Sequence, residues 1–107
     1  IPLFVVENGL GQIDEPDENG IVHDDYRINY LRQHLMALRD ACGTVWNYGL
    51  HLLGTDRYCQ RRHRRDEKRY GFVYVDRDNE GHGTMERRKK DSFAYYQNVI
   101  RTNGQEL

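Results

Sequence analysis

The first ten residues join an apolar segment to a short polar turn. Residues 1–6 are apolar without polar alternation, which is typical of a β-strand that is covered on both faces. Glu7 closes this segment, and Asn8 and Gly9 follow it. In parallel α/β folds, side chains at the carboxyl ends of strands form the active site. A glutamate before a turn is more often a solvated surface residue, so the pattern alone makes Glu7 a candidate and no more.

An acidic loop and an amphipathic helix are predicted after this strand. Residues 9–20 are rich in Gly, Asp, Glu and Asn, and they predict a surface loop at the active-site end of the fold. Asp24 or Asp25 can cap the helix that follows. Within the predicted helix, 24–40, four apolar residues recur at helical spacing and predict one stripe that covers the sheet: Ile28, Leu31, Leu35 and Leu38.

The last third of the chain predicts a hairpin and a helix. Residues 70–76 alternate between two sets of side chains, as in a hairpin strand, and residues 78–81 have turn chemistry. The final helix, 91–103, is expected to end at Asn103 and Gly104 in the left-handed manner. Its expected buried stripe is Phe93, Tyr96, Val99 and Ile100.

Composition excludes some classes of protein. The net charge of −1 and the 31% of charged residues are ordinary for a water-soluble chain. No apolar run is long enough to cross a bilayer and no signal peptide is recognisable, so a cytoplasmic location is the expectation. Cys42 and Cys59 are too few and too far apart for a recognisable metal site. Neither a metal nor a cofactor is predicted.

The order of several short motifs is more specific than any one of them. E-N-G-L-G at 7–11 follows the apolar strand, and D-D-Y-R-I-N-Y-L at 24–31 follows the acidic loop. Downstream stand K-R-Y-G-F-V-Y-V-D at 68–76, K-K-D-S-F-A-Y-Y at 89–96 and N-G at 103–104. In these blocks and their order the chain resembles glycoside hydrolase family one, and most closely its bacterial 6-phospho-β-glucosidase branch.

This resemblance implies an incomplete fold. A (β/α)8 TIM barrel needs ~250 residues or more, and this chain has 107. We therefore expect an α/β chain that is the C-terminal quarter of such a barrel, with the rest of the barrel missing. On this basis residues 1–6 are strand seven, 24–40 helix seven, 42–67 the strand-eight region, 70–76 a hairpin strand and 91–103 the final helix.

Residues 42–67 do not carry the expected eighth strand. The family has a pattern like M-G-Y-T-S-W-G-P-I-D-I-V-S-A here, whereas this chain has aromatic residues and leucines followed by a basic run. When residues 48–67 are back-translated and read one nucleotide later, they give M-G-Y-T-S-W-G-P-I-D-I-V-S-A-G-T-G-E-M-K, which leads directly into Lys68. We therefore hypothesise two compensating insertions or deletions, one between Ala41 and Tyr48 and one close to Glu67. A barrel without its eighth strand would have exposed edges.

The resemblance also implies roles for single residues. Members of the family hydrolyse β-glycosides with retention, using two glutamates roughly 5 to 5.5 Å apart. Glu7 matches the nucleophile, and Asn8 would help to orient the site, although a turn residue before Gly9 is an equally good interpretation. The acid/base glutamate belongs to an Asn-Glu-Pro motif that does not occur in this chain. The fragment alone is therefore predicted to be inactive.

Substrate class depends on two further matches. In the phospho-glycosidase branch a Ser, a Lys and a Tyr hold the 6-phosphate of the sugar, and Lys68 and Tyr70 match the last two. The serine is expected near Gln60 or Arg61 and is absent. The implied substrate is a phosphorylated β-glucoside in carbohydrate catabolism, although a phospho-galactoside is not ruled out by the sequence.

Two other classes of function remain open from the residues alone. A basic run at 61–69 is flanked by Tyr58 and Tyr70, which is the pattern of a small nucleic-acid-binding module centred on residues 57–69. The frame hypothesis disfavours this interpretation. The chain could also be a non-catalytic fragment that persists by docking to a partner that supplies the rest of the barrel. We expect no membrane partner.

Overall fold

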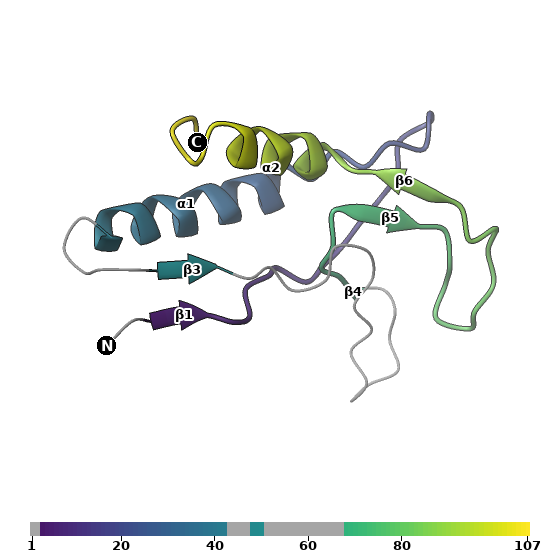
Figure 1. Ribbon diagram of the computed structural model, residues 1–107. Coiled ribbons are helices and arrows are strands. Elements are labelled where there is room, and N and C mark those ends of the chain that lie inside the picture. The colour runs from purple at the N-terminus through teal and green to yellow at the C-terminus, as the bar shows by residue number, and fades with distance from the viewer. Residues whose placement is uncertain (1–2, 43–47, 51–67) are drawn as a thin grey trace.

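The computed structural model describes residues 3–42, 48–50 and 68–107. Predictions about residues 1–2, 43–47 and 51–67, including most of the shifted-frame string and Cys59, lie outside these residues. The elements in the described part are listed in chain order: β1 (Leu3–Val5), β2 (Gln12–Ile13), α1 (Asp25–Cys42), β3 (Tyr48–Leu50), β4 (Lys68–Arg69), β5 (Val73–Val75), β6 (Arg87–Lys89) and α2 (Asp91–Arg101). Figure 1 shows their arrangement.

β1 and β3 form a parallel pair. The register runs from Leu3 opposite Tyr48 to Val5 opposite Leu50. Parallel neighbours need a crossover connection, and α1 stands between the two strands in the chain. α1 lies alongside the strand pair, and α2 lies alongside α1 (Figure 1). The result is a βαβ unit with a second helix packed on the first.

α1 corresponds to the helix predicted over 24–40 and ends two residues later, at Cys42. Of the predicted apolar stripe, Leu31 is buried and the other three residues are half-buried. The predicted capping residue Asp24 precedes the helix, but its carboxylate does not cap α1. It accepts hydrogen bonds from Ser92, at the start of α2.

α2 begins at Asp91, as the sequence predicts, and ends at Arg101. Asn103 and Gly104 have φ values of 51° and 73°, and the Gly104 amide donates to the carbonyl oxygen of Val99 at 2.8 Å. This left-handed stop is the predicted one. The prediction that Ile100 is buried is wrong, because its exposed fraction is 66%.

The described residues form two short antiparallel pairs, and only the pair β5–β6 falls where the sequence predicts a hairpin. β5 covers only the middle of the predicted strand 70–76, and it pairs with β6 across the loop 76–86. β2 pairs with β4, with Gln12 opposite Arg69 and Ile13 opposite Lys68. A two-residue strand has no periodic pattern of its own, so this second pairing was not visible in the sequence.

The buried interior of the described part is small and unusually polar. Five apolar side chains are buried, and so are five polar or charged ones: Val22, Leu31, Phe72, Val75 and Val99, against Asp14, Asp24, Arg27, Lys90 and Ser92. Buried charges are rare unless they are paired. Apolar surface remains exposed elsewhere, and no helix in the described ranges is long and apolar enough to cross a membrane.

The predicted strand 1–6 is exposed at its carboxyl end, where the sequence predicted cover on both faces. Val5 is 37% exposed and Val6, the residue after the strand, is 63% exposed.

Candidate functional site

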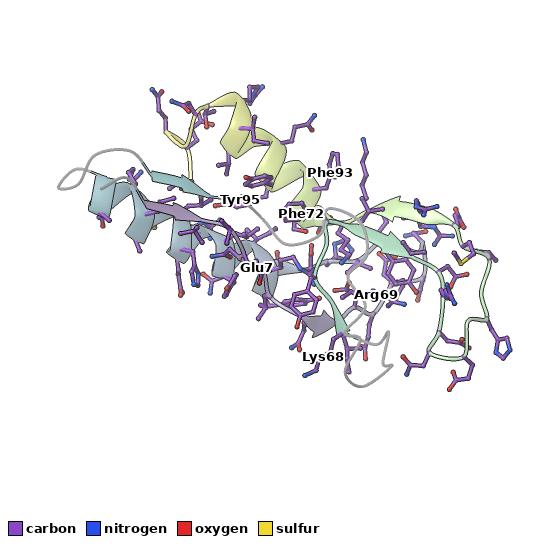
Figure 2. The ribbon with its side chains drawn as sticks, turned by 60° about the horizontal axis from the view of Figure 1, so that its bottom comes forward. Glu7, Lys68, Arg69, Phe72, Phe93 and Tyr95 are labelled. Atoms are coloured by element: carbon purple, nitrogen blue, oxygen red, sulfur yellow. The ribbon has the colours of Figure 1, made fainter. Side chains whose placement is uncertain are left out.

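Glu7 lies just past the carboxyl end of β1. Its side chain is exposed, and it is labelled in Figure 2. Parallel strands β1 and β3 end at the same edge of the pair, so Glu7 stands at the edge where parallel α/β folds place their functional groups. The pairing of β1 with β3 fixes the backbone before Glu7, and the pairing of β2 with β4 holds the segment after it.

The loop after Glu7 is attached to the segment that contains Lys68 and Tyr70. β2, five residues downstream of Glu7, pairs with β4, which is made of Lys68 and Arg69. Two sequence regions about sixty residues apart are thus held together by a backbone ladder. Lys68 is exposed on this ladder, and Figure 2 shows it together with Glu7.

Asn8 and Tyr70 meet at one small pocket. The pocket has a volume of about 10 Å³, and its wall includes Gly9, Arg27 and Phe72 as well as these two residues. That volume is close to the minimum for a single water molecule and far too small for a sugar. Asn8 Oδ1 is buried there and accepts no hydrogen bond from the described residues. Glu7 and Lys68 do not line this pocket.

Tyr70 rests directly on the backbone of Gly11. A Cβ atom added to Gly11 would lie 2.6 Å from Cε2 and 2.7 Å from the hydroxyl oxygen of Tyr70. Real Cβ atoms do not approach other atoms so closely, so only glycine allows the ring this position. The loop after Glu7 and the ring of Tyr70 therefore fit against each other without intervening side-chain atoms.

Beneath this surface lies a buried network of two acids and two bases, which we call the charge cluster: Asp14, Asp24, Arg27 and Lys90. Arg27 donates to Asp14 at 3.2 Å and also forms an ion pair with Asp24. Lys90 forms an ion pair with Asp14. The two charges of each sign balance, as buried ion pairs require.

The charge cluster links three segments of the chain: the loop at Asp14, residues 24–27 and residues 90–92. Asp14 belongs to the loop after β2, and its carboxylate also accepts from the hydroxyl of Tyr26, in the first turn of α1. Asp24 accepts from the Ser92 amide at 2.9 Å and from its hydroxyl at 2.5 Å, and thereby caps α2. The expectation that residues 9–20 form only a surface loop is wrong at Asp14, which is 4% exposed.

Burial and pairing act in opposite directions on the cluster's titrating groups. Burial lowers the pKa of Lys90, and the nearby Arg27 lowers it further, against the raising effect of Asp14. Burial also lowers the pKa of Arg27, but Asp14 and Asp24 outweigh it and the net pKa is raised. Burial and the hydrogen bond to Asp14 raise the pKa of Tyr26. These directions follow from the preference of charge for water and for an opposite partner.

Sequence reasoning missed Asp14, Arg27 and Lys90 as structural groups. Arg27 and Lys90 stood in the motifs that carry the family resemblance, but nothing local marked them as buried. Asp14 lies in an acidic stretch that looks fully solvated. Asp24 lies only three residues before Arg27, but Asp14, the acid that both cations share, is distant from Lys90 in the sequence.

The described residues provide one candidate nucleophile and no metal site. Glu7 is an exposed carboxylate at a strand end, and no group of three or more His, Cys, Asp or Glu in the described ranges could hold a metal ion. Glycoside hydrolysis with retention requires a second carboxyl group as acid and base. Glu7 is thus a candidate for one of the two carboxyl groups that such a reaction needs.

Comparisons with known proteins identify the family. Residues 1–105 match the family model of glycosyl hydrolase family 1. The chain is 50% identical over 111 aligned positions to aryl-phospho-beta-D-glucosidase BglH of Bacillus subtilis (strain 168), covering 99% of this chain and 23% of that protein. It is 48% identical to a 6-phospho-beta-glucosidase of Dickeya chrysanthemi, again with 99% and 23% coverage. The chain belongs to glycosyl hydrolase family 1.

Solved structures agree with this assignment. A beta-glucosidase from Thermotoga maritima in complex with noeuromycin matches with a TM-score of 0.81 and 31% identity, over 98% of this chain and 23% of that one. A beta-glucosidase from Exiguobacterium marinum matches with a TM-score of 0.78 and 32% identity, over 96% and 22%. The chain spans about a quarter of the length of its relatives and is a partial piece of their TIM-barrel fold.

Two sequence expectations are affected by these findings. A family match that runs through residues 57–69 gives no support to a nucleic-acid-binding module there. The region 42–67, where the sequence lacks the expected strand pattern, contains the short strand β3, which pairs in parallel with β1.

Proposed function

We propose that this chain is the nucleophile-bearing C-terminal piece of a retaining 6-phospho-β-glucosidase. The observation that carries the proposal is the position of Glu7 at the carboxyl end of a parallel strand, in a chain about half identical to relatives named as phospho-β-glucosidases. A rigid strand end aims a carboxylate at one point, which covalent catalysis requires.

Glu7 would attack the anomeric carbon of the sugar while an acid protonates the leaving oxygen. In the second step, water attacks the glycosyl-enzyme bond and the same acid acts as a base. That acid lies outside this chain, because its Asn-Glu-Pro motif does not occur in the 107 residues. The piece by itself therefore has half of the catalytic pair and is inactive.

Lys68, Tyr70 and Asn8 would contact the substrate. An exposed ammonium group and a phenol suit a phosphate that carries two negative charges. The β2–β4 ladder supports this role, because it ties Lys68 to the loop that follows Glu7. Asn8 directly follows Glu7, and its amide would help to orient the sugar at that carboxylate. A phosphorylated sugar as substrate favours the cytoplasm as the place of reaction.

The proposal includes an altered strand-eight region at 42–67. β3 supports the placement, because it is the parallel neighbour of β1 after one helical crossover, as consecutive barrel strands are. The shifted-frame string accounts for the sequence of this region. The nucleotide sequence tests this part: a single-base shift on each side must restore the family string, and the idea fails if it does not.

Activity of the chain alone is the first test. The purified chain is incubated with 4-nitrophenyl 6-phospho-β-glucoside, and release of nitrophenol is measured against a buffer blank. We expect no release above the blank, since losing one of two catalytic carboxyl groups costs orders of magnitude in rate. Turnover by the purified chain would contradict the assignment of the missing acid.

Phosphate recognition is the second test. The dissociation constants of D-glucose 6-phosphate and D-glucose are compared by NMR titration of the ¹⁵N-labelled chain. We expect the phosphorylated sugar to bind more tightly, and Lys68→Met to remove most of the difference, since a charge-assisted hydrogen bond contributes about 1.5–3 kcal/mol. Lys89→Met, another exposed lysine, serves as the control. Equal binding of the two sugars would contradict the role of Lys68.

A further inference from the structure

Two buried cations hold the backbone on both sides of Tyr70. Arg27 Nη2 donates to the carbonyl oxygen of Arg69 at 2.6 Å, and Lys90 Nζ donates to the carbonyl oxygen of Gly71 at 2.5 Å. These two carbonyl groups are the acceptors that flank the residue. The torsion angles of the chain from 69 to 71 are therefore held by two charge-assisted hydrogen bonds.

Neither cation can reach a substrate. Arg27 is 1% exposed and Lys90 is 2% exposed, whereas Lys68 is exposed. The two cations can therefore affect ligand binding only indirectly, through the backbone carbonyl groups to which they donate.

Asp14 connects both cations to the loop that follows Glu7. Its carboxylate pairs with Arg27 and with Lys90, and its own carbonyl oxygen accepts from Arg69 Nη1 at 3.5 Å. Asp14 directly follows β2, which pairs with β4. The Lys68–Tyr70 segment is thus held along one edge by a ladder and from below by the charge cluster.

We propose that Arg27 and Lys90, anchored on Asp14, are positioning residues that set the Lys68–Tyr70 segment for the phosphate of the substrate. This inference rests on the proposed function of Lys68 and Tyr70. Neutral donors could also form hydrogen bonds to these two carbonyl groups and would avoid buried charge. Charged donors on a shared buried acid give a stiffer arrangement, and a binding site for a small dianion needs groups held to within about half an ångström.

The test compares Lys90→Met with Ser92→Ala in the full 107-residue chain. Lys90→Met keeps most of the apolar stem and removes the donor to Gly71, whereas Lys90→Arg keeps a cation. Ser92→Ala removes a hydrogen bond to Asp24 at the other end of the same cluster and touches neither carbonyl of the segment. The measurements are the melting temperature, the backbone amide shifts of residues 68–72 without ligand, and the dissociation constant of D-glucose 6-phosphate.

We expect Lys90→Met to move the amide shifts of residues 68–72 and to weaken binding of D-glucose 6-phosphate by about tenfold or more. Lys90→Arg should recover most of the affinity. Ser92→Ala should lower the melting temperature while changing the dissociation constant by less than about twofold, because loss of stability alone leaves the folded site intact. Should Lys90→Met fail to fold, Asp14→Asn takes its place with the same expectations.

Two results would overturn the inference. One is an unchanged dissociation constant and unchanged amide shifts in Lys90→Met. The other is an equal loss of affinity in Ser92→Ala and Lys90→Met. Failure of the proposed function looks different, because the unmodified chain would then bind D-glucose 6-phosphate no better than D-glucose. In that case the amide shifts decide alone: movement in Lys90→Met but not in Ser92→Ala supports positioning of the segment, and the reverse contradicts it.

Discussion

The ring of Tyr70 lies on the Cα atom of Gly11, so closely that a methyl group at position 11 would overlap it. This contact joins the loop after the candidate nucleophile to the candidate phosphate-binding segment. The φ angle of Gly11 is not positive, so glycine is required here for space and not for backbone conformation.

Gly11→Ala should therefore destabilise the chain by about 1–3 kcal/mol, as overpacking does, and displace Tyr70. The loss should disappear when the ring is removed: in a Tyr70→Leu background, Gly11→Ala should be neutral or slightly stabilising, because alanine restricts the unfolded chain. Urea unfolding followed by circular dichroism measures both effects. A loss of the same size in both backgrounds would mean that the ring does not cause it.

Asp24 should matter far more for stability than its neighbour Asp25. Asp24 is fully buried and holds both Arg27 and the start of α2, whereas Asp25 is exposed in the first turn of α1. Asp24→Ala leaves a buried guanidinium short of a partner, which costs about 3–5 kcal/mol. The urea midpoint of the Asp24→Ala chain should therefore fall far below that of the unmodified chain.

Asp25→Asn provides the matched control, and exposed substitutions of this kind change the free energy of unfolding by about 0.5 kcal/mol or less. The urea midpoints of the two variants and of the unmodified chain settle the comparison. Similar midpoints for the Asp24 and Asp25 variants would contradict the charge cluster as an organising feature of the fold.

His23 should stabilise the fold only within a limited range of pH. Its ring nitrogens contact Asp91 at 2.6 Å and Asp17 at 3.0 Å, and the hydrogen bond to Asp91, followed by that to Asp17, raises the pKa of His23 above 6.5. Because the pKa of His23 is higher in the folded chain than in the unfolded chain, protonated His23 stabilises the fold. This contribution is fully present below pH 6.5 and is lost as pH rises through the folded-state pKa. The backbone hydrogen bond from Ile21 lowers the pKa of Asp17, so that residue's contribution is present above 3.8 and lost as pH falls.

The ¹H shift of the His23 Cε1 proton, followed through a pH titration, measures this directly. We expect a midpoint above 6.5 in the unmodified chain and a lower one in Asp91→Asn, since Asp91 is the stronger partner. A midpoint at or below 6.5, or one that Asp91→Asn leaves in place, would contradict the paired geometry.

The helices could be predicted from the sequence because their signals are local. Apolar residues at helical spacing marked α1, and Asn103 with Gly104 marked the end of α2. Ile100 was misplaced because a stripe in the sequence does not say how much of it a neighbouring element covers. In a piece that spans a quarter of its relatives, less of that surface is covered.

The organisation beneath the candidate site could not be predicted, because its partners are distant in the chain. Asp14 and Lys90 are 76 positions apart, and each sits among exposed charged neighbours, so local composition gives the wrong burial for both. The β2–β4 pairing has two residues on each side and no pattern. Lys68 and Tyr70 were proposed from family motifs, whereas the groups that hold the backbone around Tyr70 are visible only in three dimensions.

The central claim is that Glu7 is the nucleophile of a family 1 barrel whose other parts lie outside this chain. A chimera tests it most directly: this chain, with residues 48–67 replaced by the shifted-frame string, is substituted for the matching quarter of Bacillus subtilis BglH, and cleavage of 4-nitrophenyl 6-phospho-β-glucoside is measured. We expect the chimera to be active, Glu7→Gln to lower its kcat by at least about a thousandfold, and Glu15→Gln, an exposed glutamate of the same loop, to leave it within about twofold. An active chimera in which Glu7→Gln keeps the parent rate would contradict the claim.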